Sequence, residues 1–361
     1  MAKKIKEIAT PEVAASAAPV VKVAKKVIKK SQPKKKIIKK VSKSKVDIDL
    51  LTKQLVKDIV AIKVQGATNV ARTILEHLKI VANALPKDMP TGEFVDKLTK
   101  IGQELSFLRI TEPMARNAVS FLKTQLNAVR NTNVVTLKKV ANETVDDFLQ
   151  WIEDLDNKMT VDGVKVIRNG QKLLTHCHSS SAERILVEAH KQGKQFTVFN
   201  TETRPLYQGR TTAKHLLEAG IQTTLVVDDS ASFLISEYSG KELMMNLVIM
   251  GCDAISLDGG CVNKVGSFGI AQSAYYEGVD VYIAASLLKV DINDDSVKEI
   301  SIEQRDSKEI WPEAPKGLKM IKFAFDRVPA RFIKGYITEF GIIKPKHIKK
   351  MAKRNYRWMF T

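Results

Sequence analysis

The sequence has few cysteines and few aromatic residues: three Cys among 361 residues, and 6% Phe, Trp and Tyr. A small, odd number of cysteines excludes a disulfide scaffold and indicates a reducing compartment, so we expect a cytoplasmic protein. No apolar run approaches the roughly 20 residues that a membrane-spanning helix needs, which excludes an integral membrane protein. The apolar share of 44% is that of an ordinary globular protein, and the length suggests two domains and a tail.

Acidic residues are scarce at both ends of the chain, and this decides where the net charge of +18 lies. Residues 1–46 contain 15 Lys and 2 Glu, a charge of +13, and residues 344–361 contain five Lys, two Arg and no acid, a charge of +7. That leaves −2 for residues 47–343. The excess positive charge therefore belongs to two terminal segments, and the body is nearly neutral.

Residues 1–46 have low complexity and no aromatic residue, which predicts a disordered tail. Two interpretations stand about even: attraction to RNA, DNA or ribosomes through phosphate neutralisation, or a solubilising tail without a fixed partner. In the basic C-terminal segment, 346–361, Trp358 and Phe360 either pack on the body or stack on bases, and packing is the favoured interpretation.

Residues 47–165 follow a helical pattern, with apolar side chains such as Ile59, Ile62, Val70 and Ile74 at helical spacing. Prolines and a glycine between residues 86 and 92 end the first helical block. Further helices are predicted at 93–108, 113–129 and 144–159. We expect a small all-α domain.

From residue 166 the pattern changes to alternating strands and helices. Strands are predicted at 172–175, 195–200, 223–228, 247–250 and 279–284, and helices at 180–191, 211–219, 230–237 and 269–277. Ser180 with Glu183 fits a capping box at the start of the first of these helices. The alternation predicts an α/β fold with a Rossmann-like, doubly wound parallel sheet over residues 166–345. Ligands of such sheets bind at the carboxyl ends of the strands.

The first strand is followed by Thr-His-Cys-His-Ser-Ser, residues 175–180. A thiol at a helix N-terminus would have a lowered pKa and could be reactive, which makes Cys177 a candidate catalytic residue. On spacing alone, a small buried cysteine is favoured about two to one. No metal site is expected from His176, Cys177 and His178, because adjacent residues rarely converge on one ion.

Other strand ends also carry polar side chains. Arg204 suits bidentate binding of a phosphate or carboxylate, or is a surface loop residue. Asp253 is a candidate general base, or a cap. Asn263 and Lys264 either clamp a phosphate or hydroxyls, or cap a helix. Each signal is weak alone, and their joint placement at strand ends is the stronger argument.

The order of these motifs resembles the superfamily of ribose 1,5-bisphosphate isomerase, methylthioribose-1-phosphate isomerase and the α, β and δ regulatory subunits of translation initiation factor 2B. The resemblance covers residues 46–345. It is carried by Thr-His-Cys-His-Ser at 175–179, Thr-Glu-Thr-Arg-Pro at 201–205, Gln-Gly at 208–209, Gly-Cys-Asp at 251–253, Asn-Lys at 263–264, Phe-Asp at 325–326 and Thr-Glu-Phe-Gly at 338–341.

The resemblance implies an enzyme, because the isomerases have a catalytic Cys and Asp that match Cys177 and Asp253. The strings at 175–179 and 201–205 resemble the ribose 1,5-bisphosphate isomerase branch most. That implies conversion of ribose 1,5-bisphosphate to ribulose 1,5-bisphosphate, which would pass AMP-derived ribose to a RuBisCO, without metal or nicotinamide. Cys177 and Asp253 would share the acid and base roles, in an order left open. The substrate-binding residues implied are Gln65, Gly66, Ala67, Arg204, Gln208, Gly209, Asn263, Lys264 and Lys289.

The chain departs from the family pattern at three positions. Gln65 and Glu112 stand where the family usually has phosphate-binding arginines, with Arg116 as a possible substitute for the second, and Ser286 stands where a Glu is common. Two alternatives therefore remain: a non-catalytic regulator of translation that keeps Cys177 and Asp253, or a methylthioribose-1-phosphate isomerase, whose substrate has one phosphate. Against the latter, His-Ser-Ser follows Cys177 where that branch has Asn-Ala-Gly. Family members are commonly dimers or hexamers, which implies a homo-oligomer.

Overall fold

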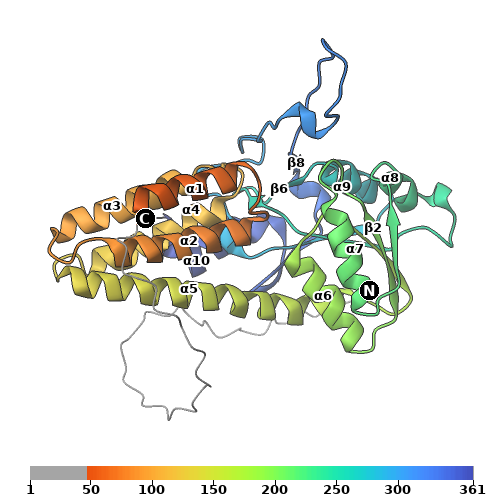
Figure 1. Cartoon of the computed structure of the whole chain (residues 1–361). Helices are drawn as coiled ribbons and strands as arrows, with labels where there is room; N and C mark the ends of the chain where they lie inside the picture. The colour runs from red at the N-terminus through yellow and green to blue at the C-terminus, as the bar shows by residue number, and fades with distance from the viewer. Residues whose placement is uncertain (1–46, 361) are drawn as a thin grey trace, which may run out of the picture.

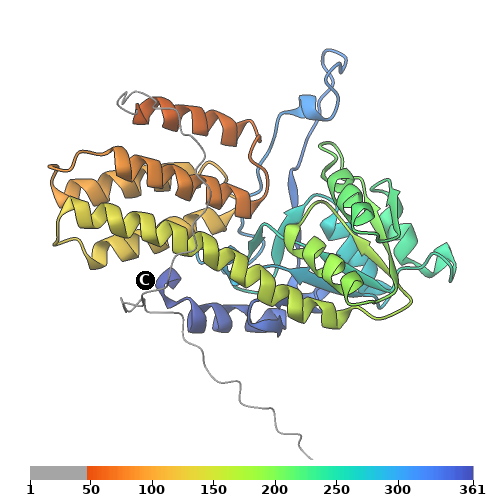
Figure 2. The same cartoon turned by 60° about the horizontal axis from the view of Figure 1, so that its bottom comes forward.

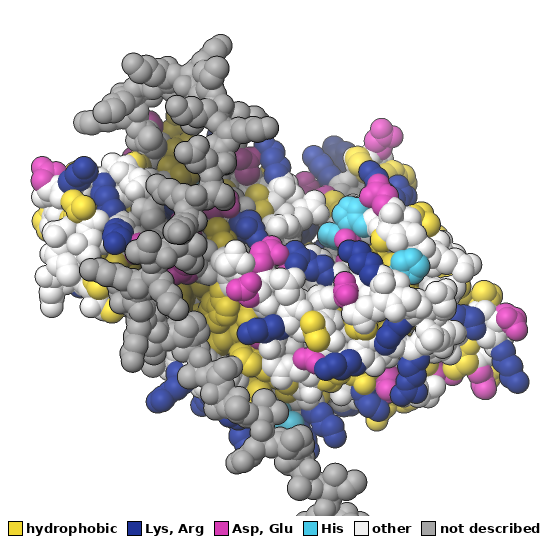
Figure 3. All heavy atoms as spheres, turned by 90° about the horizontal axis from the view of Figure 1, so that it is seen from below, with side chains coloured by type: hydrophobic (Ala, Val, Ile, Leu, Met, Phe, Trp, Pro, Cys, Tyr) yellow, Lys and Arg dark blue, Asp and Glu magenta, His cyan; other side chains and the backbone are white. Residues whose placement is uncertain are grey.

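A computed structural model describes residues 47–360. The predicted disordered tail, residues 1–46, lies outside the described residues. The chain forms a helical half and an α/β half joined by one long helix, as Figure 1 shows. Basic and acidic side chains are interspersed over the face seen in Figure 3, which agrees with the near-neutral body. Within residues 47–360, no helix is long and apolar enough to cross a membrane.

Five helices form the N-terminal half, as the pattern predicted. They are α1 (Ile48–Val60), α2 (Ala67–Ala84), α3 (Thr91–Ser106), α4 (Pro113–Ala128) and α5 (Val134–Gly163). The apolar face of α2, from Val70 to Ala82, is fully buried and packs against α3, α4 and α5. The helix predicted at 144–159 is too short, because α5 already begins at Val134. The side chain of Asn133 accepts a hydrogen bond from the backbone of Thr136 and caps that start.

The second half contains a seven-stranded sheet in the order β10-β9-β7-β4-β1-β2-β3, parallel except for the antiparallel pair β9–β10. The strands are β1 (Gln171–Thr175), β2 (Phe196–Thr201), β3 (Thr223–Val226), β4 (Leu247–Met250), β7 (Asp280–Ala284), β9 (Gly335–Thr338) and β10 (Gly341–Ile343). The connecting helices are α6 (Ser180–Lys191), α7 (Gln208–Glu218), α8 (Ser230–Ile235) and α9 (Ser267–Tyr276). The predicted order of strands and helices is confirmed from β1 to β7, whereas β9 and β10 were not predicted.

Both faces of this sheet are covered. In β1, Leu173 packs in the apolar cluster that contains α6 and α7, whereas Leu174 packs in the cluster that contains α8 and α9. In β4, Leu247 and Val248 divide between the same two clusters. Alternate side chains of a strand point to opposite faces, so a continuous apolar run is what a strand buried on both faces requires.

A second, three-stranded antiparallel sheet was not predicted. It consists of β5 (Ala254–Ile255), β6 (Cys261–Lys264) and β8 (Phe325–Val328), in the order β5-β6-β8. The chain between β7 and β8 leaves the body in a long excursion, whose tip projects clearly in Figure 2. The base of this excursion is tied to the helical half, where Thr111 donates a hydrogen bond to the backbone oxygen of Ser301 over 3.3 Å.

The basic C-terminal segment packs on the body. It forms α10 (Ile348–Asn355) and a short 3-10 turn, and the Trp358 ring lies edge-on to Phe121 of α4 with centroids 5.1 Å apart. Tyr356 is buried edge-on against Trp151 of α5. The favoured interpretation for this segment is therefore confirmed, and these aromatic rings form part of the helical core.

Candidate active site

A cavity of about 150 Å³ opens between the helical half and the carboxyl ends of the parallel strands. It brings together residues that lie far apart in the sequence, and it includes most of the residues predicted as a site. Those lining it are Gln65, Gly66, Ala67, Cys177, Gln208, Asp253, Asn263, Lys264 and Lys289. The volume is below the range of about 300–1,000 Å³ typical of drug-sized ligands, which favours a compact substrate.

Cys177 follows β1 directly and has a left-handed backbone, with φ of 67°. Its backbone N–H donates to the Thr203 hydroxyl over 3.0 Å, and its carbonyl accepts from the Thr212 hydroxyl over 3.0 Å. Burial raises the pKa of the Cys177 thiol to about 11, with Lys264 opposing the shift. The prediction of a lowered pKa was wrong, because desolvation of the thiolate outweighs the nearby charge. Cys177 is thus a protonated thiol at neutral pH.

The start of α6 differs from the predicted capping box by one residue. The side chain of Ser179, not Ser180, accepts from the backbone N–H of Ala182 over 3.3 Å. Glu183 instead turns toward His215 of α7, and its two carboxylate oxygens lie 3.0 and 3.1 Å from that imidazole.

His176 has a structural position. Its Nδ1 lies 2.6 Å from the Thr201 hydroxyl, and its Nε2 lies 2.9 Å from the backbone oxygen of Val265. Burial lowers the pKa of this imidazole to about 4, so the ring is neutral. Because both ring nitrogens are engaged, His176 offers no ligand atom to an ion.

Asp253 follows β4 and is held by its backbone N–H, which donates to the carbonyl of Val262 over 2.9 Å. Burial raises the pKa of the Asp253 carboxyl, while Lys289, Lys264 and Arg109 oppose that rise. The Lys289 ammonium donates to the carbonyl of Cys252 over 2.8 Å, which fixes a positive charge near the carboxyl. Asp253 therefore combines a buried carboxyl with nearby cations, the environment in which acid and base groups are tuned.

Asn263 and Lys264 lie on β6, the strand that follows the glycine turn at residues 259–260. The Asn263 amide donates to the Ser267 hydroxyl over 2.8 Å, and the Lys264 ammonium lies 4.8 Å from the centre of the Phe325 ring. Both side chains are buried at the cavity. The small antiparallel sheet, which the sequence did not predict, thus supplies two polar groups of the cavity wall.

Gln65, Gly66 and Ala67 lie where α2 begins. Gly66 precedes the helix with φ of 85°, and no side chain caps the first turn. The residues of this turn line the cavity, and the free N–H groups of a helix start favour an anion. On α7, the buried Oε1 atom of Gln208 has no hydrogen-bond partner within residues 47–360.

Two arginines that sequence reasoning missed also line the cavity: Arg109, between α3 and α4, and Arg305, at the base of the excursion. Glu303 links them, because it accepts from Arg109 Nε over 3.0 Å and from Arg305 Nη2 over 3.2 Å. Arg109 also contacts Glu112. Nη1 of Arg109, and Nε and Nη1 of Arg305, are buried and have no partner in the part of the chain that the structure describes. Such donors fit a bound anion.

Glu112 lines the same cavity and is almost fully buried. Burial raises its pKa to about 8, although Arg109 opposes the shift. The carboxyl is therefore mostly protonated at neutral pH and does not repel an anion there. Arg116 does not take over the position of the expected arginine, because it pairs with Asp291 and its other nitrogen donates to the carbonyl of Ile110.

Two residues predicted to bind substrate do not line this cavity. Arg204 is exposed, and its backbone N–H donates to the Asp228 carboxylate over 2.7 Å. Gly209 lies against β2, where a Cβ atom would come within 1.8 Å of the Thr201 carbonyl oxygen. Gly209 thus allows close packing of a helix start on a strand. Arg204 lies in the loop after β2, and this loop places its side chain at the surface and outside the cavity.

Comparison with known proteins agrees with this geometry. Residues 63–345 match the model of the initiation factor 2 subunit family. The chain is 31% identical over 318 residues to ribose 1,5-bisphosphate isomerase of Methanocaldococcus jannaschii, covering 88% of this chain and 98% of that protein. It is also 31% identical over 274 residues to methylthioribose-1-phosphate isomerase of Desulforamulus reducens, covering 72% of this chain and 78% of that protein.

Among solved structures, translation initiation factor eIF-2B of Pyrococcus horikoshii superimposes with a TM-score of 0.69 at 21% identity, covering 82% of this chain and 97% of that one. This likeness confirms the fold. The family match extends over most of the chain and includes the motifs on which the resemblance was based. The chain belongs to the initiation factor 2 subunit family.

Proposed function

We propose that this chain is an aldose–ketose isomerase acting on a pentose that carries a phosphate on C1, with ribose 1,5-bisphosphate as its first candidate substrate. The observation that carries the proposal is the meeting of Cys177 and Asp253 in one compact cavity that also contains unpartnered cationic donors. The relatives that share about 31% identity with the chain and are named as sugar-phosphate isomerases support the reaction class.

The chemistry requires one group that gives a proton and one that takes a proton. A phosphate on C1 keeps the sugar ring closed, so opening it needs a proton delivered to the ring oxygen as the C1–O bond breaks. Hydrogen then moves from C2 to C1 while the C2 hydroxyl loses its proton, and the product is a ketose of the same composition. Cys177 and Asp253 supply the two proton-transfer groups, since burial raises the pKa of both above their ordinary values.

The charge of the cavity supports binding of a phosphorylated sugar. Lys264, Lys289, Arg109 and Arg305 supply four positive charges at its wall. Two carboxyl groups line the cavity, those of Asp253 and Glu112, and burial raises the pKa of both, which reduces the negative charge that faces an anion. A phosphate oxygen that is buried and unpaired costs several kcal/mol, so these donors matter for affinity.

One observation favours a second candidate, a pentose 1-phosphate without a second phosphate. Glu112 stands in the cavity wall as a group without positive charge, and Glu303 neutralises part of the charge of Arg109 and Arg305. This leaves fewer cations for a second phosphate. The two candidates differ in the substituent on C5, and a direct comparison of substrates distinguishes them.

The test is to incubate the purified full-length protein with ribose 1,5-bisphosphate and, separately, with methylthioribose 1-phosphate, and to measure ketose formation. Cys177→Ser and Asp253→Asn should each lower kcat at least about 100-fold, because removal of a general acid or base costs about that much. Asp229→Asn is the matched control, since Asp229 is an exposed aspartate beyond β3. It should retain full turnover.

Two outcomes contradict the proposal. Absence of ketose from both substrates would leave the chain as a non-catalytic regulator, the alternative that the family also contains. If Asp253→Asn is as stable as the parent in denaturant and turns over substrate at the same rate, the catalytic role of this cavity is refuted.

We also propose that the chain forms a homo-oligomer, as the resemblance implied. Light scattering measures the mass of the assembly and tests this proposal.

A further inference from the structure

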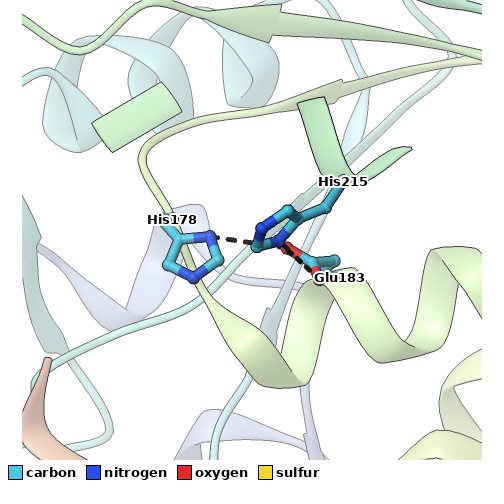
Figure 4. Close-up of side chains that lie close together, drawn as sticks. All are labelled: His178, Glu183 and His215. Carbon is cyan, nitrogen blue, oxygen red and sulfur yellow. Dashed lines mark hydrogen bonds and ion pairs between the residues drawn. The ribbon is translucent and has the colours of Figure 1, made fainter. Parts of the chain in front are cut away.

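Beside the cavity, three potential metal ligands from three segments of the chain converge on one point. His178 lies in the loop between β1 and α6, Glu183 lies on the first turns of α6, and His215 lies on α7, as Figure 4 shows. Their ligand atoms all lie within 4.8 Å of one another. None of the three was predicted as a ligand, because their spacing in the sequence resembles no metal motif.

The geometry of this cluster fits a small ion. Oε2 of Glu183 lies 3.4 Å from Nδ1 of His178 and 3.0 Å from Nδ1 of His215. Zinc binds imidazole nitrogen and carboxylate oxygen at about 2.0–2.2 Å, so two ligands of a tetrahedral ion lie about 3.4 Å apart. The contact of Glu183 with His178 has this separation, and its contact with His215 is shorter, at 3.0 Å. The two imidazole rings lie edge to face with centroids 5.6 Å apart, and the ligand atoms of all three side chains lie within 4.8 Å of one another.

The three side chains are accessible to an ion. The side chain of His178 is 33% exposed, that of His215 is 41% exposed, and that of Glu183 is 19% exposed. Histidine side chains reach the surface on the α/β half in Figure 3. Nδ1 of His178 lies 3.0 Å from the Thr212 hydroxyl, which itself donates to the carbonyl of Cys177, so this nitrogen exchanges the contact with Thr212 for the ion.

We propose that His178, Glu183 and His215 bind a divalent transition-metal ion, with Zn²⁺ as the best match. Two histidines and one carboxylate form a known zinc-binding set that leaves a fourth position for water. Imidazole suits zinc, copper and nickel, whereas magnesium and calcium prefer oxygen ligands. The ion binds through Nδ1 of both rings. Without the ion, Nδ1 of His215 donates to Glu183 and Nδ1 of His178 donates to Thr212, so binding moves the proton of each ring to Nε2.

The site connects to the cavity through His178, which lines it and directly follows Cys177. A bound ion therefore joins α6, α7 and the loop that positions the thiol, and fixes the left-handed backbone of Cys177. Its role is structural or regulatory, and the isomerisation does not pass through it. This inference does not depend on the proposed function, because metal binding is measured without any substrate.

The experiment uses the full-length protein after treatment with a chelator. Zn²⁺ alone is titrated by calorimetry, and Co²⁺ is titrated as a visible-absorbance probe of tetrahedral coordination. We expect one equivalent to bind, an increase in Tm with Zn²⁺, and at least a tenfold weaker Kd in His215→Ala and in Glu183→Gln. His347→Ala is the matched control, because His347 is exposed and lies outside the cluster. It should bind as the parent does.

The Cys177 thiol lies close to the cluster, so its role in metal binding is tested separately. Cys177→Ser should still bind one equivalent, because the sulfur is not a ligand in this proposal. The proposal is overturned if the parent takes up no Zn²⁺, if Glu183→Gln and His215→Ala bind as tightly as the parent, or if Cys177→Ser alone abolishes binding. Thermal unfolding of each metal-free variant, compared with the metal-free parent, separates loss of the site from loss of the fold.

Discussion

Glu112 is the buried carboxyl whose titration we expect to be visible in both stability and substrate binding. It lies in the cavity wall, contacts Arg109, and has an Oε2 atom without a hydrogen-bond partner among residues 47–360. Burial raises its pKa from 4.5 to about 8. Glu112→Gln replaces the carboxyl with an uncharged group of the same size, and so removes the titration while it keeps the packing.

The sign of the effect follows from proton linkage. Between pH 4.5 and about 8, the folded protein retains a proton on Glu112 that the unfolded chain has released. The free energy of unfolding contributed by this group therefore falls as pH rises through that window and is constant above it. At about 1.4 kcal/mol for each pH unit, the loss amounts to about 4 kcal/mol between pH 5 and pH 8.

Urea unfolding of the parent and of Glu112→Gln at pH 5, 6, 7 and 8 measures this difference. The variant should gain on the parent steadily, by a total of about 4 kcal/mol over the series. Glu104→Gln is the matched control, because Glu104 is exposed on α3, and its difference from the parent should be small and independent of pH. If the curves of Glu112→Gln and the parent stay parallel, the carboxyl is already ionised in the folded protein and the reasoning is refuted.

Three further predictions concern the cavity wall, the packing of α7 and the tail. Arg305→Gln should raise KM about 10- to 100-fold without loss of stability, because it removes buried donors that have no partner among the described residues; steady-state kinetics measures this, and an unchanged KM would contradict it. Gly209→Ala should destabilise the protein by several kcal/mol, since a Cβ would lie 1.8 Å from the Thr201 oxygen, and urea unfolding with no shift in midpoint would contradict the clash. The hypothesis that the basic tail contacts RNA predicts that deletion of residues 1–46 removes RNA association at low salt and leaves kcat unchanged, as measured by gel-shift and turnover assays; equal RNA association with and without the tail would contradict it.

The sequence predicted the arrangement of the fold because its apolar periodicity is strong. The change near residue 166 separates helical spacing from strand–helix alternation, and the structure changes from α5 to β1 at nearly that point. Cys177 and Asp253 were predictable as neighbours because each directly follows a parallel strand, and parallel strands end at one edge of the sheet. Their side-chain environment was not predictable, since the thiol pKa depends on burial that no local pattern reports.

The arginines of the cavity were missed for a different reason. Arg109 lies in a connection between two helices, and Arg305 lies in an excursion without periodic apolar residues. Only the tertiary contacts of Glu303 bring the two guanidinium groups together, across nearly two hundred residues of sequence. A comparison of motifs looks for arginines at fixed positions of the sequence. It therefore reports that the arginines expected at positions 65 and 112 are missing, although Arg109 and Arg305 bring guanidinium groups to the cavity from other segments.

The distribution of charge separates binding of a phosphorylated sugar at the cavity from contact of the basic tail with nucleic acid. The net charge of +18 does not distinguish the two. The body has a charge of −2, yet four cationic side chains gather at one cavity, so its attraction for a phosphorylated sugar is local and partly shielded from salt. The tail carries +13 on residues outside the described structure, and any contact it makes with nucleic acid depends on exposed charges that salt screens strongly. The KM for substrate should therefore change little when the salt concentration rises from about 50 to about 200 mM. Any affinity of the tail for RNA should fall by orders of magnitude over the same range. If both quantities changed together, the cavity and the tail would not be independent sites.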